Sequence, residues 1–318
     1  MQSSTLFDPI RPFQTLRIDV GGGHQLHVEI SGNPEGLPIV MLHGGPGSGL
    51  NPDHRRLFDP AKFMLIQFDQ RGCGQSTPHG ATAENTTQHL VRDIDTIRSQ
   101  LAIQTWHIAG GSWGSTLALA YARTFTRQVR SLTLYGIFLG RQKELEALYF
   151  KGGIASRLFP ELFADFLKLL PEKDTGNPIE GYAKLFASQP SAQRTQALLQ
   201  WTQLEKQCSR LVVEQHELAA DLTNEPYILA HSLIENHYFR HNCFIDGDAL
   251  LASAGRFLAD IPVTLINGRY DIVTPPETAY ELTKAIPHAH LMIVEGAGHS
   301  VKEPSLNKAF IQALDSLA

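Results

Sequence analysis

The sequence is poor in cysteine. Its 318 residues include three cysteines, Cys73, Cys208 and Cys243, which lie far apart along the chain. An odd number of widely spaced cysteines does not make the disulfide framework that stabilises small secreted proteins. These cysteines form no CxxC motif and no cluster with histidine at the spacing of metal ligands, so we expect neither a metal nor a cofactor. The pattern favours a reducing compartment, and we predict a cytoplasmic protein.

The sequence also lacks long apolar segments and basic segments. No segment approaches the roughly 20 apolar residues that a membrane-spanning helix needs, and residues 1–5 lack the basic and apolar regions of a secretory signal. The formal net charge is −5, and lysine and arginine do not gather in a basic run. We therefore expect a protein that binds neither membranes nor nucleic acid. The sequence leaves the oligomeric state open.

Strand-like and helix-like segments alternate through much of the chain, which is 42% hydrophobic and 19% charged. Short apolar runs predict strands, and apolar residues at helical spacing predict helices. The expected strands are residues 14–20, 24–30, 39–42, 63–68, 106–109, 131–135, 262–266 and 290–294, and the expected helices are residues 87–101, 115–120 and 277–286. The first two strands, joined by three glycines, predict an edge hairpin. The others predict the α/β class, with a mostly parallel, doubly wound sheet covered on both faces.

The alternation stops after Phe138. Between residues 140 and 258 there is no convincing series of strands, only helical stretches rich in leucine, glutamate, lysine and glutamine. Open α/β sheets bind ligands at the carboxyl ends of their strands, so a helical cap over that edge is the simplest interpretation. We predict a core made of residues 1–139 and 259–318, interrupted by an inserted helical cap of residues 140–258.

The pentapeptide Gly110-Gly111-Ser112-Trp113-Gly114 matches the G-x-S-x-G pattern. An apolar run precedes it, and a run of small, helix-prone residues follows it. A strand, a tight turn and a helix in that order lift the serine above the edge of a parallel sheet, as a nucleophile elbow does. Glycine-rich turns also match this pattern by chance, but the strand–turn–helix context favours the elbow. We predict that Ser112 is a nucleophile.

A serine hydroxyl needs a base to remove its proton, and the elbow predicts an acid and then a histidine, each after a late strand. Asp271 follows the strand at 262–266, and His299 follows the strand at 290–294. Asp271 alone could be a turn residue or a helix cap, and His299 is one of 14 histidines. The order of the three residues favours a triad in which His299 acts as base and then acid, and Asp271 orients it.

A glycine-rich loop, His43-Gly44-Gly45-Pro46-Gly47, follows the buried strand at 39–42. Acyl transfer needs two fixed N–H donors for the oxyanion of the tetrahedral intermediate. We expect the backbone N–H of Trp113 to be one donor and a glycine of this loop to be the other. Gly45 is the first choice, and Gly44 is the alternative.

A charged turn, Asp69-Gln70-Arg71-Gly72, ends the strand at 63–68. Its polar residues could suggest a catalytic role. We interpret the turn as structural, bracing the glycine-rich loop, with Arg71 paired to a nearby carboxylate.

Eight segments, which together span nearly the whole chain, carry a resemblance to a known family. They are residues 43–47 (HGGPG), 69–76 (DQRGCGQS), 110–120 (GGSWGSTLALA), 136–139 (GIFL), 155–160 (ASRLFP), 234–239 (IENHYF), 268–271 (GRYD) and 298–300 (GHS). The chain resembles the proline iminopeptidases, or prolyl aminopeptidases, of the serine-peptidase branch of the α/β-hydrolase superfamily. The first three segments occur in many capped hydrolases, whereas the cap segments are more specific. The resemblance implies the α/β-hydrolase fold.

The resemblance also implies a substrate: small peptides with a free N-terminus, from which one residue, preferably proline, is released. It implies that two cap glutamates, Glu205 and Glu235, bind the α-ammonium group, a task that suits a partly desolvated carboxylate pair. Without the resemblance, Glu205 would be assigned to a solvated helix face and Glu235 to a structural salt bridge. Leu204 departs from the family, which usually has tryptophan there. The resemblance assigns the slot for the proline ring to three aromatic residues: Phe138, Tyr149 and Phe239.

Two other functions fit part of these observations. A capped esterase or amidase for small acyl substrates would use the same triad, with the cap glutamates in a structural role. A ligand-binding protein that keeps the hydrolase fold would need no activated serine. The intact triad and oxyanion loop favour an enzyme over the second of these.

Overall fold

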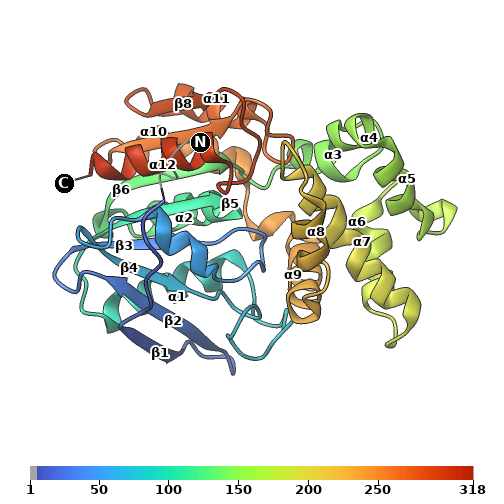
Figure 1. The fold of residues 1–318 in the computed structure, drawn as a ribbon, viewed down its shortest axis with the longest axis horizontal. Helices are drawn as coiled ribbons and strands as arrows, with labels where there is room; N and C mark the ends of the chain where they lie inside the picture. Colours follow the sequence, from blue (N-terminus) through green and yellow to red (C-terminus); the bar gives the residue numbers. More distant parts are fainter. Residues whose placement is uncertain (1–5, 318) are drawn as a thin grey trace.

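Eight strands form one sheet in the computed structural model, which describes residues 6–317 (Figure 1). The strands are β1 (Gln14–Asp19), β2 (Gln25–Gly32), β3 (Leu37–Leu42), β4 (Phe63–Phe68), β5 (Trp106–Ser112), β6 (Val129–Ile137), β7 (Val263–Gly268) and β8 (His290–Val294). Their order across the sheet is β1-β2-β4-β3-β5-β6-β7-β8. β2 runs antiparallel to β1 and β4, and the other neighbouring pairs are parallel. The predicted mostly parallel sheet and its edge hairpin are confirmed.

Helices cover both faces of this sheet. They are α1 (Thr87–Gln100), α2 (Trp113–Thr124), α10 (Gly247–Phe257), α11 (Pro276–Ala285) and α12 (Pro304–Asp315). Alternate residues of a strand point to opposite faces. Val40 and Leu42 of β3 therefore share a core with α1, α2, α10 and α11, whereas Ile39 and Met41 share a second core with α12. The doubly wound arrangement is thus confirmed.

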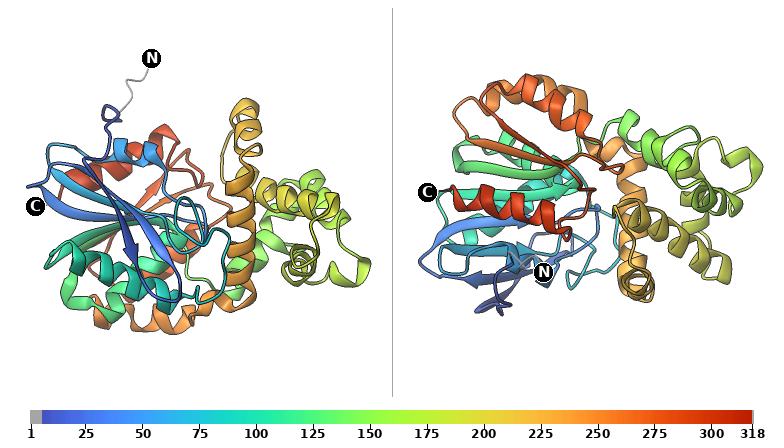
Figure 2. Two further views of the ribbon diagram at one scale, coloured as in Figure 1. Left: turned by 90° about the horizontal axis from the view of Figure 1, so that it is seen from below. Right: turned by 45° about the horizontal axis from the view of Figure 1, so that its top comes forward.

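Seven α-helices lie between β6 and α10, where the chain contains no strand. They are α3 (Gln142–Tyr149), α4 (Ile154–Leu158), α5 (Pro160–Lys168), α6 (Pro178–Phe186), α7 (Ala192–Cys208), α8 (Gln215–Asp221) and α9 (Glu225–Arg240). Figures 1 and 2 show this block beyond one end of the sheet, with α9 nearest to the core. Among its helices, α9 packs on both α6 and α7.

The last helix before β7 packs on the core. The main contacts of α10 are with α2 and α11, which cover the sheet. Its apolar residues follow the same helical spacing as those of the cap helices, so sequence periodicity does not separate the two groups. We therefore propose that the cap ends before Gly247 and that α10 belongs to the core, in place of the boundary expected at residue 258.

The turn after β4 braces the glycine-rich loop, as predicted. Nε and Nη2 of Arg71 donate to the two carboxylate oxygens of Asp93, at 2.7 and 2.8 Å. Gln70 donates from Nε2 to the carbonyl oxygen of His43 at 2.9 Å, and its Oε1 accepts from Nε1 of Trp113 at 3.0 Å. Burial lowers the pKa of His43 to about 4, so its neutral Nε2 accepts from the backbone N–H of Gln70 at 3.0 Å. The turn thus ties the loop to the start of α2.

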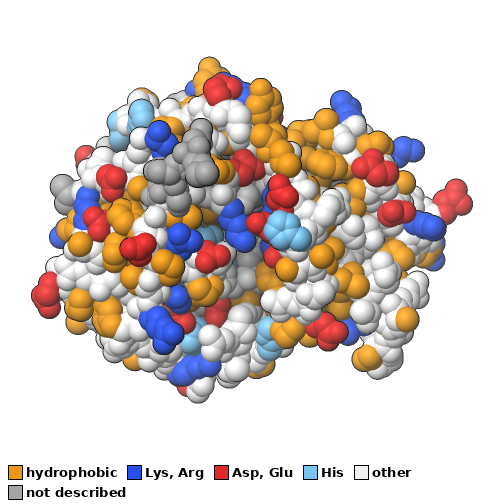
Figure 3. All heavy atoms as spheres, in the orientation of Figure 1, with side chains coloured by type: hydrophobic (Ala, Val, Ile, Leu, Met, Phe, Trp, Pro, Cys, Tyr) orange, Lys and Arg blue, Asp and Glu red, His pale blue; other side chains and the backbone are white. Residues whose placement is uncertain are grey.

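The surface shows no strong segregation of charge on the face seen in Figure 3, where basic side chains are scattered among acidic ones. Within residues 6–317, no helix combines the length and the apolar character that are needed to cross a bilayer. The expectation that the protein does not bind nucleic acid stays a prediction.

Candidate active site

Ser112 lies at the junction of β5 and α2, where the backbone takes an uncommon conformation. Its φ of 55° and ψ of −126° are unfavourable for a residue with a side chain. The flanking glycines leave room for this turn, because a Cβ on Gly110 would lie 2.7 Å from the carbonyl oxygen of Gly114. A Cβ on Gly114 would collide with the carbonyl oxygen of Leu42. Strand, turn and helix together hold the Ser112 side chain at the carboxyl edge of the sheet.

The loops after β7 and β8 bring Asp271 and His299 together. Nδ1 of His299 lies 2.8 Å from Oδ2 of Asp271. Oδ1 of Asp271 accepts from the backbone N–H groups of Val273 and Thr274, at 3.0 and 2.8 Å. The hydroxyl of Thr274 donates to Oδ2 at 2.8 Å. These bonds fix a fully buried carboxylate, which in turn orients the imidazole and leaves its Nε2 available for proton transfer.

Asp271 also controls the protonation of His299. Burial disfavours the imidazolium and alone would lower the pKa of His299. The adjacent carboxylate outweighs burial, and the pKa of His299 lies above its ordinary value of 6.5. A base of higher pKa accepts the proton of a serine more readily, provided that it is itself neutral at the working pH.

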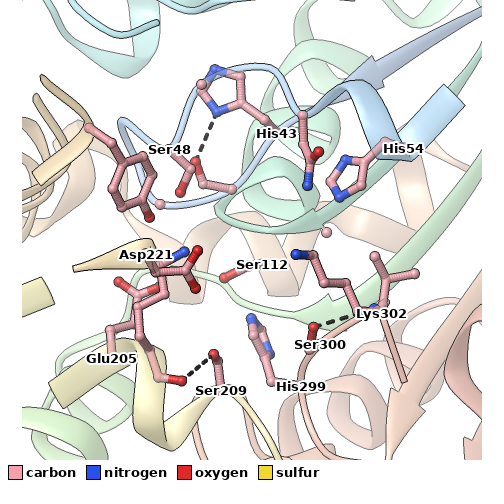
Figure 4. A pocket seen from close by; sticks show the side chains of 18 of the residues that line it. His43, Ser48, His54, Ser112, Glu205, Ser209, Asp221, His299, Ser300 and Lys302 are labelled. Atoms are coloured by element: carbon pink, nitrogen blue, oxygen red, sulfur yellow. Dashed lines mark hydrogen bonds between the residues drawn. The ribbon is translucent and has the colours of Figure 1, made fainter. Parts of the chain in front are cut away.

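Ser112 and His299 line one cavity of about 430 Å³. Figure 4 shows the imidazole of His299 pointing toward Ser112. Gly44 and Gly45 form part of the same wall, and a Cβ on Gly44 would lie 3.3 Å from that of Ser112. Trp113 is the first residue of α2, where backbone N–H groups have no partner within the helix. The candidate oxyanion donors therefore surround the serine.

A narrow recess leads from Ser112 toward the cap. The ring centroids of Phe138 and Phe239 are 6.1 Å apart, and those of Tyr149 and Phe239 are 5.5 Å apart. These contacts form a rigid apolar wall beside the nucleophile. The structure thus brings the three aromatic residues together with both glutamates and Gly45 in the lining of the recess: Gly45, Ser112, Phe138, Tyr149, Glu205, Glu235 and Phe239.

Glu235 is a buried carboxyl group of the recess, with 2% of its side chain exposed. Its Oε2 accepts a hydrogen bond from Nε1 of Trp201 at 2.6 Å and another from the hydroxyl of Tyr149 at 3.2 Å. Burial and the nearby charge of Glu205 raise the pKa of Glu235 well above its ordinary range. These surroundings favour the protonated, neutral form of Glu235.

Glu205 has a different partner, His231 of α9. Nε2 of His231 lies 2.8 Å from Oε2 of Glu205 and 3.7 Å from Oε1 of Glu235. Burial alone would raise the pKa of Glu205, but the attraction of His231 outweighs burial and holds this pKa below its ordinary range. The two opposite shifts favour an ionised Glu205 beside a neutral Glu235, so that the pair shares one negative charge.

Glu205, His231 and Glu235 each offer a possible metal-ligand atom, and these atoms lie within 4.8 Å of one another. Within residues 6–317 this is the only such cluster of three groups. Two carboxylates and an imidazole form a ligand set that divalent transition metals accept. The chemistry of Ser112 and His299 requires no metal, and the expectation that the protein uses none stays a prediction.

Comparison with known proteins shows the family to which the chain belongs. The model of the alpha/beta hydrolase fold family matches residues 38–304. The proline iminopeptidase of Xylella fastidiosa strain 9a5c is 42% identical over 312 residues, which cover 98% of this chain and 99% of that protein. The proline iminopeptidase of Xanthomonas citri is also 42% identical, over 315 residues and 99% of each chain. The chain belongs to the proline iminopeptidase family.

A solved structure shares the fold. The proline iminopeptidase of Mycobacterium smegmatis matches with a TM-score of 0.64 and 22% identity, over 95% of this chain and 98% of that one. At this identity the likeness shows the fold alone. Together with the match of the family model, it confirms the predicted α/β-hydrolase fold.

The sequence analysis did not identify two residues that contact the glutamate pair, Trp201 and His231. Each lies four residues before a glutamate, Trp201 before Glu205 and His231 before Glu235. Residues four apart share one face of a helix, and this spacing is the signal that could have identified them. Their contacts cross between the helices, however. Trp201 bonds to Glu235 and His231 contacts Glu205, which only the packing of α7 against α9 shows.

Proposed function

We propose that this protein is a serine exopeptidase that releases an N-terminal residue, preferably proline, from small peptides. The observation that carries the proposal is the recess that joins Ser112 to the buried pair Glu205 and Glu235. An exopeptidase must hold the terminal amine of its substrate at a fixed distance from the scissile carbonyl. An esterase or amidase for small acyl substrates has no need of buried carboxylates beside its nucleophile, and no observation on this site favours it.

In the proposed mechanism, Nε2 of His299 removes the proton of the Ser112 hydroxyl while the oxygen attacks the scissile carbonyl. Asp271 stabilises the imidazolium that forms. The backbone N–H groups of Gly45 and Trp113 bind the oxyanion; Gly45 lines both the cavity and the recess, which supports its choice over Gly44. His299 then protonates the leaving amine. A water molecule, activated by the same imidazole, releases the residue from the acyl-enzyme.

The glutamate pair would bind the α-ammonium group. An N-terminal proline carries a secondary ammonium with one positive charge and two N–H donors, which matches two carboxyl groups that share one negative charge. A cation beside Glu235 favours its ionised form, so binding of the amine promotes loss of the proton from Glu235. A substrate acylated on nitrogen brings no charge and leaves ionised Glu205 without a cation from the substrate.

A rigid aromatic wall should select the size of the N-terminal residue. We expect kcat/KM for proline p-nitroanilide to exceed that for leucine p-nitroanilide by about tenfold or more, because apolar pockets discriminate by about this factor for small changes in size. A panel of aminoacyl p-nitroanilides with free amines measures this selectivity. Equal rates for proline, leucine and phenylalanine would contradict a proline slot made by Phe138, Tyr149 and Phe239.

The pH dependence of kcat/KM should reflect the raised pKa of His299. The imidazole must be neutral to act as a base, so kcat/KM should rise with pH through a midpoint above about 6.5. The rate at which a fluorophosphonate labels Ser112 should follow the same acidic limb, because labelling needs the base but no substrate amine. If the pH profile of the labelling rate had its midpoint well below pH 6.5, Asp271 would not raise the pKa of His299 as proposed.

The cellular location is a separate proposal, and we infer that the protein is cytoplasmic. Cys73, Cys208 and Cys243 are all buried and none is in a disulfide. Free thiols persist in a reducing compartment.

A further inference from the structure

The cavity around Ser112 is lined by Glu205 on one side and by Lys302 on the other. Figure 4 shows Glu205 on one side of Ser112, and His54 and Lys302 on the other. All of these residues line the same cavity of about 430 Å³. If the amine of a peptide occupies the recess, the residues beyond the scissile bond lie in this cavity. The side of the cavity that carries Lys302 then faces the part of the peptide that leaves after cleavage.

Lys302 is the unpaired cation of this cavity. Within the described part of the chain, its ammonium group makes no ion pair and no hydrogen bond. The other basic residues of the lining have partners. Arg210 donates to Asp221 at 3.0 Å, and the ammonium of Lys206 lies 4.6 Å from the ring centroid of Tyr227. The positive charge of Lys302 therefore remains available to an anion.

Within residues 6–317, the acidic residue next to Lys302 in the sequence bonds to the backbone and makes no ion pair with Lys302. The adjacent carboxylate of Glu303 accepts hydrogen bonds from the backbone N–H groups of Gly298 and Leu211, at 2.6 and 2.9 Å. Burial and the nearby charge of Lys302 lower the pKa of His54 to about 4. His54 is therefore neutral near pH 7, and its imidazole offers the cavity a single N–H donor.

We propose that Lys302, with His54 beside it, forms a subsite for the C-terminal carboxylate of a short leaving peptide. This inference rests on the proposed exopeptidase function. A short peptide with free ends is a zwitterion, and its two charges match the two sides of the cavity, with the ammonium at Glu205 and the carboxylate at Lys302. The cavity thus favours short peptides with a free C-terminus over their amides.

The test compares kcat/KM for the free acids and the C-terminal amides of Pro-Gly, Pro-Gly-Gly and Pro-Gly-Gly-Gly. We expect the ratio of acid to amide to be highest at the length that reaches Lys302. At that length, Lys302→Met should lower the ratio by about two- to fivefold, the range for a solvent-exposed charge pair. Lys302→Glu should lower it further. In the wild-type protein, sodium chloride should reduce the ratio, because salt screens exposed charges.

Lys308→Met is the matched control. Lys308 is an exposed lysine of α12 that does not line the cavity, so its loss should leave the ratio unchanged. Each ratio is measured within one protein, and a loss of folded enzyme therefore cancels. An identical ratio in the wild type, Lys302→Met and Lys302→Glu at every length would overturn the subsite. Failure of the proposed function looks different, since the wild type would then release proline from neither form.

Discussion

Ser112→Ala should lower kcat for proline p-nitroanilide by about 10⁶-fold, the scale seen when the nucleophile of a catalytic triad is removed. Alanine removes the oxygen that forms the acyl-enzyme but leaves the recess and the glutamate pair in place. Binding should therefore change little. Steady-state hydrolysis measures the first effect, and calorimetric titration with free proline measures the second.

Ser253→Ala is the matched control for this prediction. The Ser253 hydroxyl donates to the carbonyl oxygen of Ala249 within α10, so this variant should keep full activity. A fluorophosphonate should label the wild type and Ser253→Ala but not Ser112→Ala. Substantial hydrolysis by purified Ser112→Ala would show that another group is the nucleophile.

Glu235→Gln should lower kcat/KM for proline p-nitroanilide by about 30- to 5,000-fold. This range corresponds to a loss of about 2–5 kcal/mol of transition-state stabilisation. Glutamine keeps the volume of the side chain, and its carbonyl oxygen can still accept from Trp201 and Tyr149. The substitution therefore removes mainly the capacity to carry a negative charge beside the ammonium. Initial rates over a range of substrate concentrations give kcat/KM directly.

Two further variants separate this effect from a loss of structure. Glu205→Gln should reduce kcat/KM in the same direction, because it removes the ionised member of the pair. Glu180→Gln alters a surface glutamate that pairs with Arg240 at 3.0 Å, and this variant should keep its activity. If Glu235→Gln lowered the melting temperature and left kcat/KM unchanged, the pair would have a structural role only.

The strands and the order of the catalytic residues could be predicted because each depends on local sequence. A short apolar run followed by a glycine-rich turn predicts a strand end, and the run before Gly110 became β5 as expected. In a parallel sheet, the turns after the strands meet at one edge. Ser112, Asp271 and His299, each expected just after a strand, therefore come together without further long-range information.

The cap site could not be predicted in the same way. Glu205 lies in a charged stretch of α7, and only the packing of α9 against α7 buries it beside His231. The protonation states of Glu205 and Glu235 depend on that packing. The pKa shift of each carboxyl group arises from its burial and from a partner on the other helix. The extent of the cap was also ambiguous, because α10 has a cap-like apolar spacing and packs on the core.

We propose that Glu205 and Glu235 recognise the free N-terminal amine of the substrate. The most direct measurement is the ratio of kcat/KM for proline p-nitroanilide to that for its N-acetyl derivative, with the wild-type enzyme. Acetylation removes the charge and the N–H donors while it keeps the ring and the scissile bond. We predict that the acetylated substrate is slower by about 10³-fold or more, because a site built to bond to the amine keeps unpaired polar groups when the substrate lacks its N–H donors. Equal rates for the two substrates would contradict the claim and favour a capped amidase that does not recognise the amine.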